Sequence, residues 1–238
     1  MHYLYRCKGV YTTDPKLIKN AKKINKISYE EMLEMASLGA KVMQPASIQE
    51  ARLNRIEIDV RSTFSKTAGT TITKKKNIFS NNTIRGISFT KNDAKLTLIG
   101  VKDKPGIAAS IFKPLYENSI NVDMVVQNVS AGGKETDLTF TIKLEDLKKT
   151  EKLVKNNKYI KYRKLIINKN VSKVSIVGVG MITTPGITFR MFKALAKKRI
   201  NIEVISTSEI KISVLIDKKN LKKSVEILHQ EFKLNNSL

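Results

Sequence analysis

The sequence predicts an α/β (α+β) fold that contains two similar small domains in tandem. Pro105-Gly106-Ile107 and Pro185-Gly186-Ile187 open two similar stretches, in which Phe-Lys and Leu are followed by Ile-Asn-Val-Asp or Ile-Asn-Ile-Glu. An apolar run that ends in Gly-Val precedes both copies. Two copies of one strand–turn–helix–strand unit indicate two related domains and two comparable candidate sites.

Length and composition are those of an ordinary globular protein. The 238 residues are 41% hydrophobic and 27% charged, which allows two or three small cores. No apolar run reaches the roughly 18 to 20 residues that span a bilayer, and the N-terminus lacks the layout of a signal peptide. The single cysteine, Cys7, excludes an internal disulfide, and with only two histidines the chain offers no Cys- or His-rich metal site. We therefore expect a cytoplasmic protein without metal or membrane partners.

The net charge of +23 comes from lysines that are spread over the whole chain. The short basic clusters at 74–76 and 197–199 lack the interleaved aromatic residues on which single-strand binders stack bases. Arginine, the preferred reader of bases and phosphates, is scarce, with 8 Arg against 36 Lys. A solvated basic surface is therefore favoured, and nucleic-acid binding is a remote alternative.

The first part of the chain, residues 1–75, differs in pattern from the repeats. Ser28 followed by acidic residues predicts an N-capped helix, and Pro45 opens a second helix. The alternation of apolar and polar residues at 56–60 predicts a strand. The polar stretch 65–82 is the best candidate for a linker.

The two copies predict the split βαβ arrangement of ferredoxin-like sandwiches. The first copy is expected to contain strand 95–101, helix 105–118 bent at Pro114, strands 120–129 and 137–144 around a turn at 130–133, helix 145–155 and strand 161–167. The second is expected to contain strand 172–179, helix 185–199, strands 201–206 and 210–217, and helix 219–232. Because this copy is one strand short, we expect the unpaired strand 84–90 to complete it, so that the first domain is inserted into the second.

Longer motifs in both copies resemble the regulatory repeats of aspartate kinases, which are ACT domains, small modules that bind amino acids. The motifs are 121–130 in the first copy and 174–181, 184–186 and 200–213 in the second, while 9–16, 26–36 and 39–43 are similar to the end of the kinase domain. The resemblance implies a partial amino-acid-kinase (catalytic) domain at 1–75, a linker and completing strand at 76–94, a first ACT domain at 95–168 and a second at 171–238.

The activity implied by this resemblance is the phosphorylation of L-aspartate by ATP to 4-phospho-L-aspartate, the first step toward lysine, threonine and methionine. Mg-ATP would be a substrate of the complete enzyme, and no cofactor of this chain is expected. The phosphate-binding segment that opens aspartate kinases does not precede Gly9, and the Gly178-Val179-Gly180 run is no phosphate-binding loop. We expect a truncated or regulatory-subunit form that is inactive alone, because phosphoryl transfer depends on positioning the phosphates and the acceptor.

Three residues fall on nucleotide-side positions of the kinase domain by resemblance: Tyr11, Lys16 and Lys41. Without the resemblance they would be a loop aromatic, a surface lysine and a cation at a helix end. Tyr5-Arg6 stand where the family usually has Thr-Asp, which replaces a carboxylate near the nucleotide by a cation.

A helix N-terminus offers backbone N–H groups to a carboxylate, and a glycine there permits close approach. By resemblance the effector, lysine or threonine, lies between the repeats. The residues implied are Asp103, Gly106, Ala108 and Gln127 on one wall, and Asn201 and Ile202 from the other repeat. Asp103 would pair with the ammonium group, and Gln127 would both donate and accept hydrogen bonds.

A second effector site is less well equipped, because Thr184 and Thr207 stand where the first copy has Asp103 and Gln127. The residues of this second candidate site are Met181, Thr184, Gly186 and Thr207. The simpler alternative is that Pro-Gly only starts each helix. We expect a homodimer that forms through the sheet edges of the ACT domains, and a full-length aspartate kinase chain is a further candidate partner. An amino-acid-sensing ACT protein without a kinase partner remains the alternative.

Overall fold

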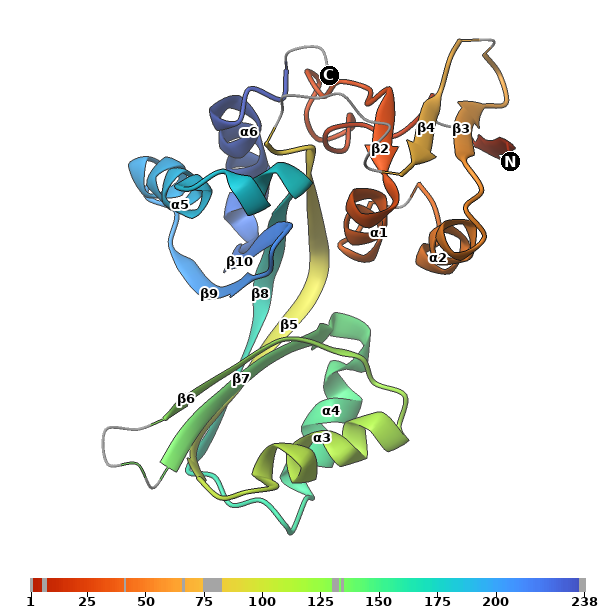
Figure 1. Ribbon diagram of the computed structural model, residues 1–238. Helices are drawn as coiled ribbons and strands as arrows, with labels where there is room; N and C mark the ends of the chain where they lie inside the picture. Colours follow the sequence, from red (N-terminus) through yellow and green to blue (C-terminus); the bar gives the residue numbers. More distant parts are fainter. Residues whose placement is uncertain are drawn as a thin grey trace. The chain divides into compact units, whose positions relative to one another are not determined.

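The computed structural model describes residues 2–5, 8–40, 42–65, 67–74, 83–129, 133 and 135–235 (Figure 1). The chain divides into two compact units. Unit 1 comprises residues 1–90, 173–203 and 207–238, and unit 2 comprises residues 91–172 and 204–206. The first repeat is therefore inserted between two parts of the second, as the strand count predicts. The bounds of the four predicted segments, 1–75, 76–94, 95–168 and 171–238, stay predictions.

A four-stranded mixed sheet and two helices form the N-terminal part of unit 1. The strand order is β1-β3-β4-β2, with β1 at His2–Tyr5, β2 at Lys26–Ser28, β3 at Ile58–Ser62 and β4 at Thr70–Thr73. Helices α1 (Tyr29–Ser37) and α2 (Pro45–Leu53) pack over a core that includes Ile27, Met32, Ile48 and Ile72. Strand β4 pairs with both β2 and β3, so the linker prediction for 65–82 is wrong at Thr70–Thr73. Residues 75–82 lie outside the described residues.

Helix α1 begins at the residue that the sequence indicates. Ser28 accepts the N–H of Glu31 at 3.1 Å, and the Ser28 N–H donates to Oε2 of Glu31 at 3.3 Å. This reciprocal capping box satisfies two of the backbone donors that a helix start would otherwise leave unpaired. It also fixes the Glu31 side chain against the first turn of α1.

The second repeat lies in unit 1 and contains part of a long strand that begins before the first repeat. Its strand order is β5-β8-β10-β9, from β5 (Gly86–Lys102), β8 (Lys164–Val177), β10 (Lys211–Asp217) and β9 (Ile202–Thr207). The short helices η3 (Val179–Thr183) and η4 (Lys218–Asn220) precede α5 (Ile187–Lys197) and α6 (Leu221–Glu231). The core includes Ile87, Val174, Met191 and Val225, so the first part of β5 belongs to this domain.

The first repeat forms unit 2, with strand order β6-β7-β5-β8. Strand β7 (Glu135–Lys143) pairs with the later part of β5 on one side and with β6 (Val122–Val129) on the other, while η2 (Leu144–Asp146) leads into α4 (Leu147–Lys155). Helix α3 (Ile107–Glu117) and α4 cover one face of this sheet (Figure 1). Most of the predicted turn at 130–133 lies outside the described residues.

Two predicted strand breaks are absent. Strands 84–90 and 95–101 form the single strand β5, and strands 161–167 and 172–179 form the single strand β8. Polar residues suggest a break near 91–93, but Asp93 already pairs with Lys143 of β7. Ladder hydrogen bonds therefore continue through a stretch whose side chains resemble a turn.

Pro114 inside α3 is compensated by a residue from beyond α4. A proline has no N–H, so the carbonyl four residues earlier loses its helical partner. That carbonyl belongs to Ser110, and the Asn157 side-chain amide donates to it at 2.9 Å. Across the part of the chain that the structure describes, no helix is long and apolar enough to cross a membrane.

Candidate effector site

The start of α3 in the first repeat is open and is shaped by a glycine. Gly106 has φ of +86°, in the left-handed region, and no atom lies within 4 Å of a Cβ built on it. The glycine is therefore needed for the backbone conformation and not to avoid a clash. Ile107 behind it is buried, anchors the helix and donates its N–H to the carbonyl of Lys104 at 3.2 Å, so the N–H groups of Ala108 and Ala109 are the first-turn donors that the helix itself leaves unpaired.

The predicted first-repeat residues flank this helix start. Asp103 is exposed after the end of β5, Ala108 lies half-buried in the first turn of α3, and Gln127 is exposed on β6, an edge strand of the sheet. Among the described residues Asp103 forms no ion pair, so its carboxylate is available to a cationic ligand. Asn201 and Ile202 lie in unit 1, before and at the start of β9, and their part in this site stays a prediction.

The corresponding loop of the second repeat makes more contacts within the chain. Gly186 repeats the open, left-handed geometry at φ of +86°. Upstream of it, Oγ1 of Thr184 lies 3.4 Å from Oγ1 of Thr83, and the Thr184 N–H donates to the carbonyl of Met181 at 3.4 Å. Thr207, the fourth predicted residue, is exposed at the end of β9. Thr184 therefore uses its polar groups inside the protein.

A carboxylate that the sequence interpretation assigned only to helix capping reaches this loop. Oε1 of Glu31 accepts the N–H of Val179 at 3.1 Å, and Oε2 lies 3.5 Å from Nε of Arg85. Both charged side chains are almost fully buried. The acidic first turn of α1 was visible in the sequence, but nothing local to it indicates a contact with residue 179.

Comparison with known proteins supplies the family. The ACT domain family matches residues 96–157 and 174–232, about half of the chain, and the amino acid kinase family matches residues 3–62. An aspartokinase from Pseudomonas aeruginosa is 45% identical over 230 residues, which are 95% of this chain and 56% of that protein. The regulatory subunit of aspartate kinase from Thermus thermophilus, solved ligand-free, is 36% identical with a TM-score of 0.59, over 63% of this chain and 99% of that one.

The chain belongs to the aspartate kinase family. It corresponds to the C-terminal region, a short amino-acid-kinase segment followed by two ACT domains. The chain spans just over half the length of the curated relatives that it matches. Aspartate kinase from Clostridium acetobutylicum shares the fold, with a TM-score of 0.85 at 24% identity over 97% of this chain and 54% of that chain.

In the kinase segment, two of the residues predicted for the nucleotide side, Tyr11 and Lys16, lie in a hydrogen-bonded loop, and their role stays a prediction. Tyr11 forms an isolated bridge with Lys23, and the exposed Lys16 donates its N–H to Oδ1 of Asp14 at 2.8 Å. Between them, the Thr12 carbonyl accepts the N–H of Ile87 at 2.7 Å. Lys41 lies outside the described residues.

Thr12 also ties this loop to helix α6. Its Oγ1 lies 2.9 Å from Nε2 of His229, and it accepts the N–H of Lys22 at 3.1 Å. The imidazole is buried, and burial lowers the pKa of His229 because desolvation disfavours the charged form. The ACT helix α6 therefore contacts the loop that contains Thr12 through a hydrogen bond with a neutral imidazole.

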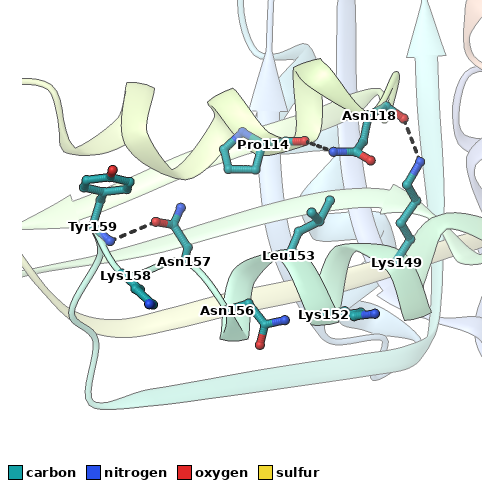
Figure 2. A pocket seen from close by; sticks show the side chains of 9 residues that line it. All are labelled: Pro114, Asn118, Lys149, Lys152, Leu153, Asn156, Asn157, Lys158 and Tyr159. Atoms are coloured by element: carbon teal, nitrogen blue, oxygen red, sulfur yellow. Dashed lines mark hydrogen bonds between the residues drawn. The ribbon is translucent and has the colours of Figure 1, made fainter.

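A cavity of about 570 Å³ lies between α3 and the end of α4 in the first ACT domain (Figure 2). Its lining residues are Pro114, Asn118, Lys149, Lys152, Leu153, Asn156, Asn157, Lys158 and Tyr159. Lys149 reaches the carbonyl of Asn118 at 3.2 Å, across the opening. None of the predicted effector residues lines this cavity. Lysines here complement the negative ends of the two helices, which is a structural role.

Proposed function

We propose that the first ACT domain binds a free amino acid, lysine or threonine, and that this binding regulates aspartate kinase chemistry. That chemistry is the transfer of a phosphoryl group from Mg-ATP to L-aspartate, which yields 4-phospho-L-aspartate. The observation that carries the proposal is the open, glycine-capped start of α3 beside the exposed carboxylate of Asp103. The family to which the chain belongs gives this site its regulatory meaning.

Each part of an amino acid has a matching group at this site. The backbone N–H groups of Ala108 and Ala109 suit the carboxylate, because a helix start carries unpaired donors and a partial positive charge. Asp103 suits the ammonium group, and Gln127 on the edge strand β6 offers a donor and an acceptor to the side chain. We propose Asn201 and Ile202 as contributors from the second repeat.

The proposal includes a partner. Strands β6 and β9 are the edges of the sheet order, and their unpaired backbone groups favour pairing with a second copy of this chain. A full-length aspartate kinase chain is the other candidate partner, supported by the 36% identity to a regulatory subunit. Tyr11 and Lys16 would then lie near a nucleotide in the complete catalytic domain.

Thermal unfolding of the full chain with lysine, threonine, methionine and ATP, each added separately, tests the proposal. An amino acid at 100 times its dissociation constant should add about 2.7 kcal/mol of stability. Asp103→Asn should weaken binding by roughly 1.5 to 3 kcal/mol, the range for hydrogen bonds to charged groups. Glu145→Gln, at an exposed acidic position of the same unit, is the matched control. A chain that no amino acid stabilises would refute the sensor function.

A further inference from the structure

Glu31 of helix α1 is a buried carboxylate that three separate segments share. It is 1% exposed, and its Oε1 accepts the N–H of Val179 at 3.1 Å. Its Oε2 lies 3.5 Å from Nε of Arg85 and within 3.3 Å of both the backbone nitrogen and the hydroxyl of Ser28. One side chain thereby joins α1, the residues before β5 and the loop that follows β8.

The first repeat makes a related contact without help from the kinase segment. At its Gly-Val pair the donor is the glycine and not the valine: the N–H of Gly100 donates to Oδ1 of Asp137 of strand β7 at 2.8 Å, whereas the N–H of Gly178 donates to the carbonyl of Ile210 at 2.9 Å. In both repeats, therefore, a backbone N–H of the Gly-Val pair donates to a carboxylate. In the second repeat, however, the carboxylate comes from a helix outside the ACT domain.

The loop that Glu31 holds, residues 178–184, is also tightly packed. A Cβ on Gly178 would lie 2.2 Å from the carbonyl oxygen of Thr83, and one on Gly180 would lie 2.6 Å from the Thr83 Cα. Such contacts are far shorter than van der Waals distances, so the two glycines let the loop lie directly on the backbone at residues 83–85. The counterpart of Gly178 in the first repeat is Gly100, where a Cβ would lie 2.2 Å from Nε of Arg163, a side-chain atom and not the backbone.

We infer that Glu31 is a positioning residue that fastens the 178–184 loop to helix α1 and keeps this loop from binding the carboxylate of a free amino acid. The second half of the inference rests on the proposed function, in which a free amino acid binds at the first repeat. A ligand carboxylate at the second repeat would compete with Glu31 for the Val179 N–H. It would have to displace an anion that is already paired with Arg85 in a buried environment.

The contact of Glu31 with the 178–184 loop gives the two repeats different roles. Both repeats have an open glycine at the helix start, and in the first repeat the exposed carboxylate of Asp103 accompanies it, so the first repeat can take a ligand. The second repeat has its loop bound to the kinase segment, so a displacement of residues 178–184 must move α1 or break the Glu31 contact. Glu31 is therefore one of the points at which the second repeat contacts the kinase segment, beside the hydrogen bond between Thr12 and His229 and the ion pair of Lys211 with Glu34 at 3.0 Å.

Glu31→Gln in the full chain tests the fastening without any ligand. Glutamine keeps the side-chain volume and suits the capping box with Ser28, but it removes the charge that Val179 and Arg85 contact. The matched control is Glu30→Gln, which alters the neighbouring carboxylate, paired on the surface with Arg52 at 3.4 Å. Amide hydrogen exchange across residues 178–184 should be roughly fivefold faster or more in Glu31→Gln, because charge-assisted hydrogen bonds are about twice as strong as neutral ones. Equal exchange in this variant, the control and the parent chain would overturn the fastening.

Calorimetric titration with lysine and with threonine tests whether Glu31 keeps the 178–184 loop from binding an amino acid. The parent chain and Glu30→Gln should bind one amino acid per chain, whereas Glu31→Gln should gain a second, weaker binding event. Two amino acids bound per parent chain, or an unchanged number in Glu31→Gln, would overturn this half. If the parent chain binds neither amino acid, the proposed function fails, while the exchange measurement still decides the fastening.

Discussion

Replacing Arg85 with methionine removes the cation of the buried pair and leaves the Glu31 carboxylate in place. The two charged groups are 3.5 Å apart, and the side chains are 4% and 1% exposed. At an effective dielectric constant of about 20, unit charges at this separation attract by roughly 5 kcal/mol. The cost of removing both ions from water offsets much of this attraction in the intact pair, but an unpaired buried charge costs about 3 to 5 kcal/mol.

We expect Arg85→Met to lower the free energy of unfolding by about 3 to 5 kcal/mol, a large part of the stability of a typical domain. Urea unfolding followed by circular dichroism measures the change. In the double variant Glu31→Gln with Arg85→Met, the loss should fall well below the sum of the single losses, because no unpaired charge remains. The surface pair of Arg61 and Asp59, 3.0 Å apart with side chains 47% and 27% exposed, supplies the control. Arg61→Met should cost no more than about 1 kcal/mol.

Two results would refute this reasoning. A loss for Arg85→Met no larger than that for Arg61→Met would mean that water screens the buried pair as it does the surface pair. Additive losses in the double variant would mean that Arg85 and Glu31 contribute independently, and that the short separation between them has no energetic consequence.

Two further predictions concern a helix and a histidine. Asn157→Ala should cost about 1 to 3 kcal/mol, because the Ser110 carbonyl loses the donor that stands in for the missing N–H of Pro114. Adding Pro114→Ala should recover most of this loss in urea unfolding, and no recovery would contradict the compensation. Because burial lowers the pKa of His229, its contribution to stability is complete above the unfolded value of 6.5 and declines as the pH falls toward the folded value. Thermal unfolding between about pH 7.5 and 5.5 should show a loss that is smaller in His229→Gln, and equal losses would exclude His229 as its source.

Local features of the fold were predictable because neighbouring residues decide them. Ser28 is the predicted N-cap of α1, where it also forms a capping box with Glu31, and both Pro-Gly turns place the glycine in the left-handed region before a helix. The insertion of the first repeat was predictable by counting strands, since a sheet that lacks one strand must find it elsewhere in the chain. Asp103 and Gln127, which the resemblance implies for the effector site, are exposed in the first repeat, and their role in binding stays a prediction.

The features that the sequence did not predict have a common cause, because each depends on contacts between segments that are distant in the chain. The Thr-Thr-Ile-Thr run of β4 lies in a polar stretch, and its pairing with β2 and β3 decides its structure. The contact between Glu31 and Val179 joins residues 148 positions apart, and no periodicity in either segment reports it. The same holds for Thr12 and His229, which are 217 positions apart.

The insertion of the first repeat also sets an order for folding during synthesis. Apart from residues 204–206, unit 2 is complete once residue 172 has been made, whereas unit 1 still lacks β10 and α6, which end at Glu231. At roughly 5 to 20 residues per second, this interval lasts about 3 to 12 seconds. Until β10 has been made, the part of β8 that belongs to the second repeat lacks this neighbour in the sheet. The nascent chain therefore exposes an incomplete sheet edge for seconds, which is the interval in which a chaperone would protect it and strand exchange between neighbouring chains would be most damaging.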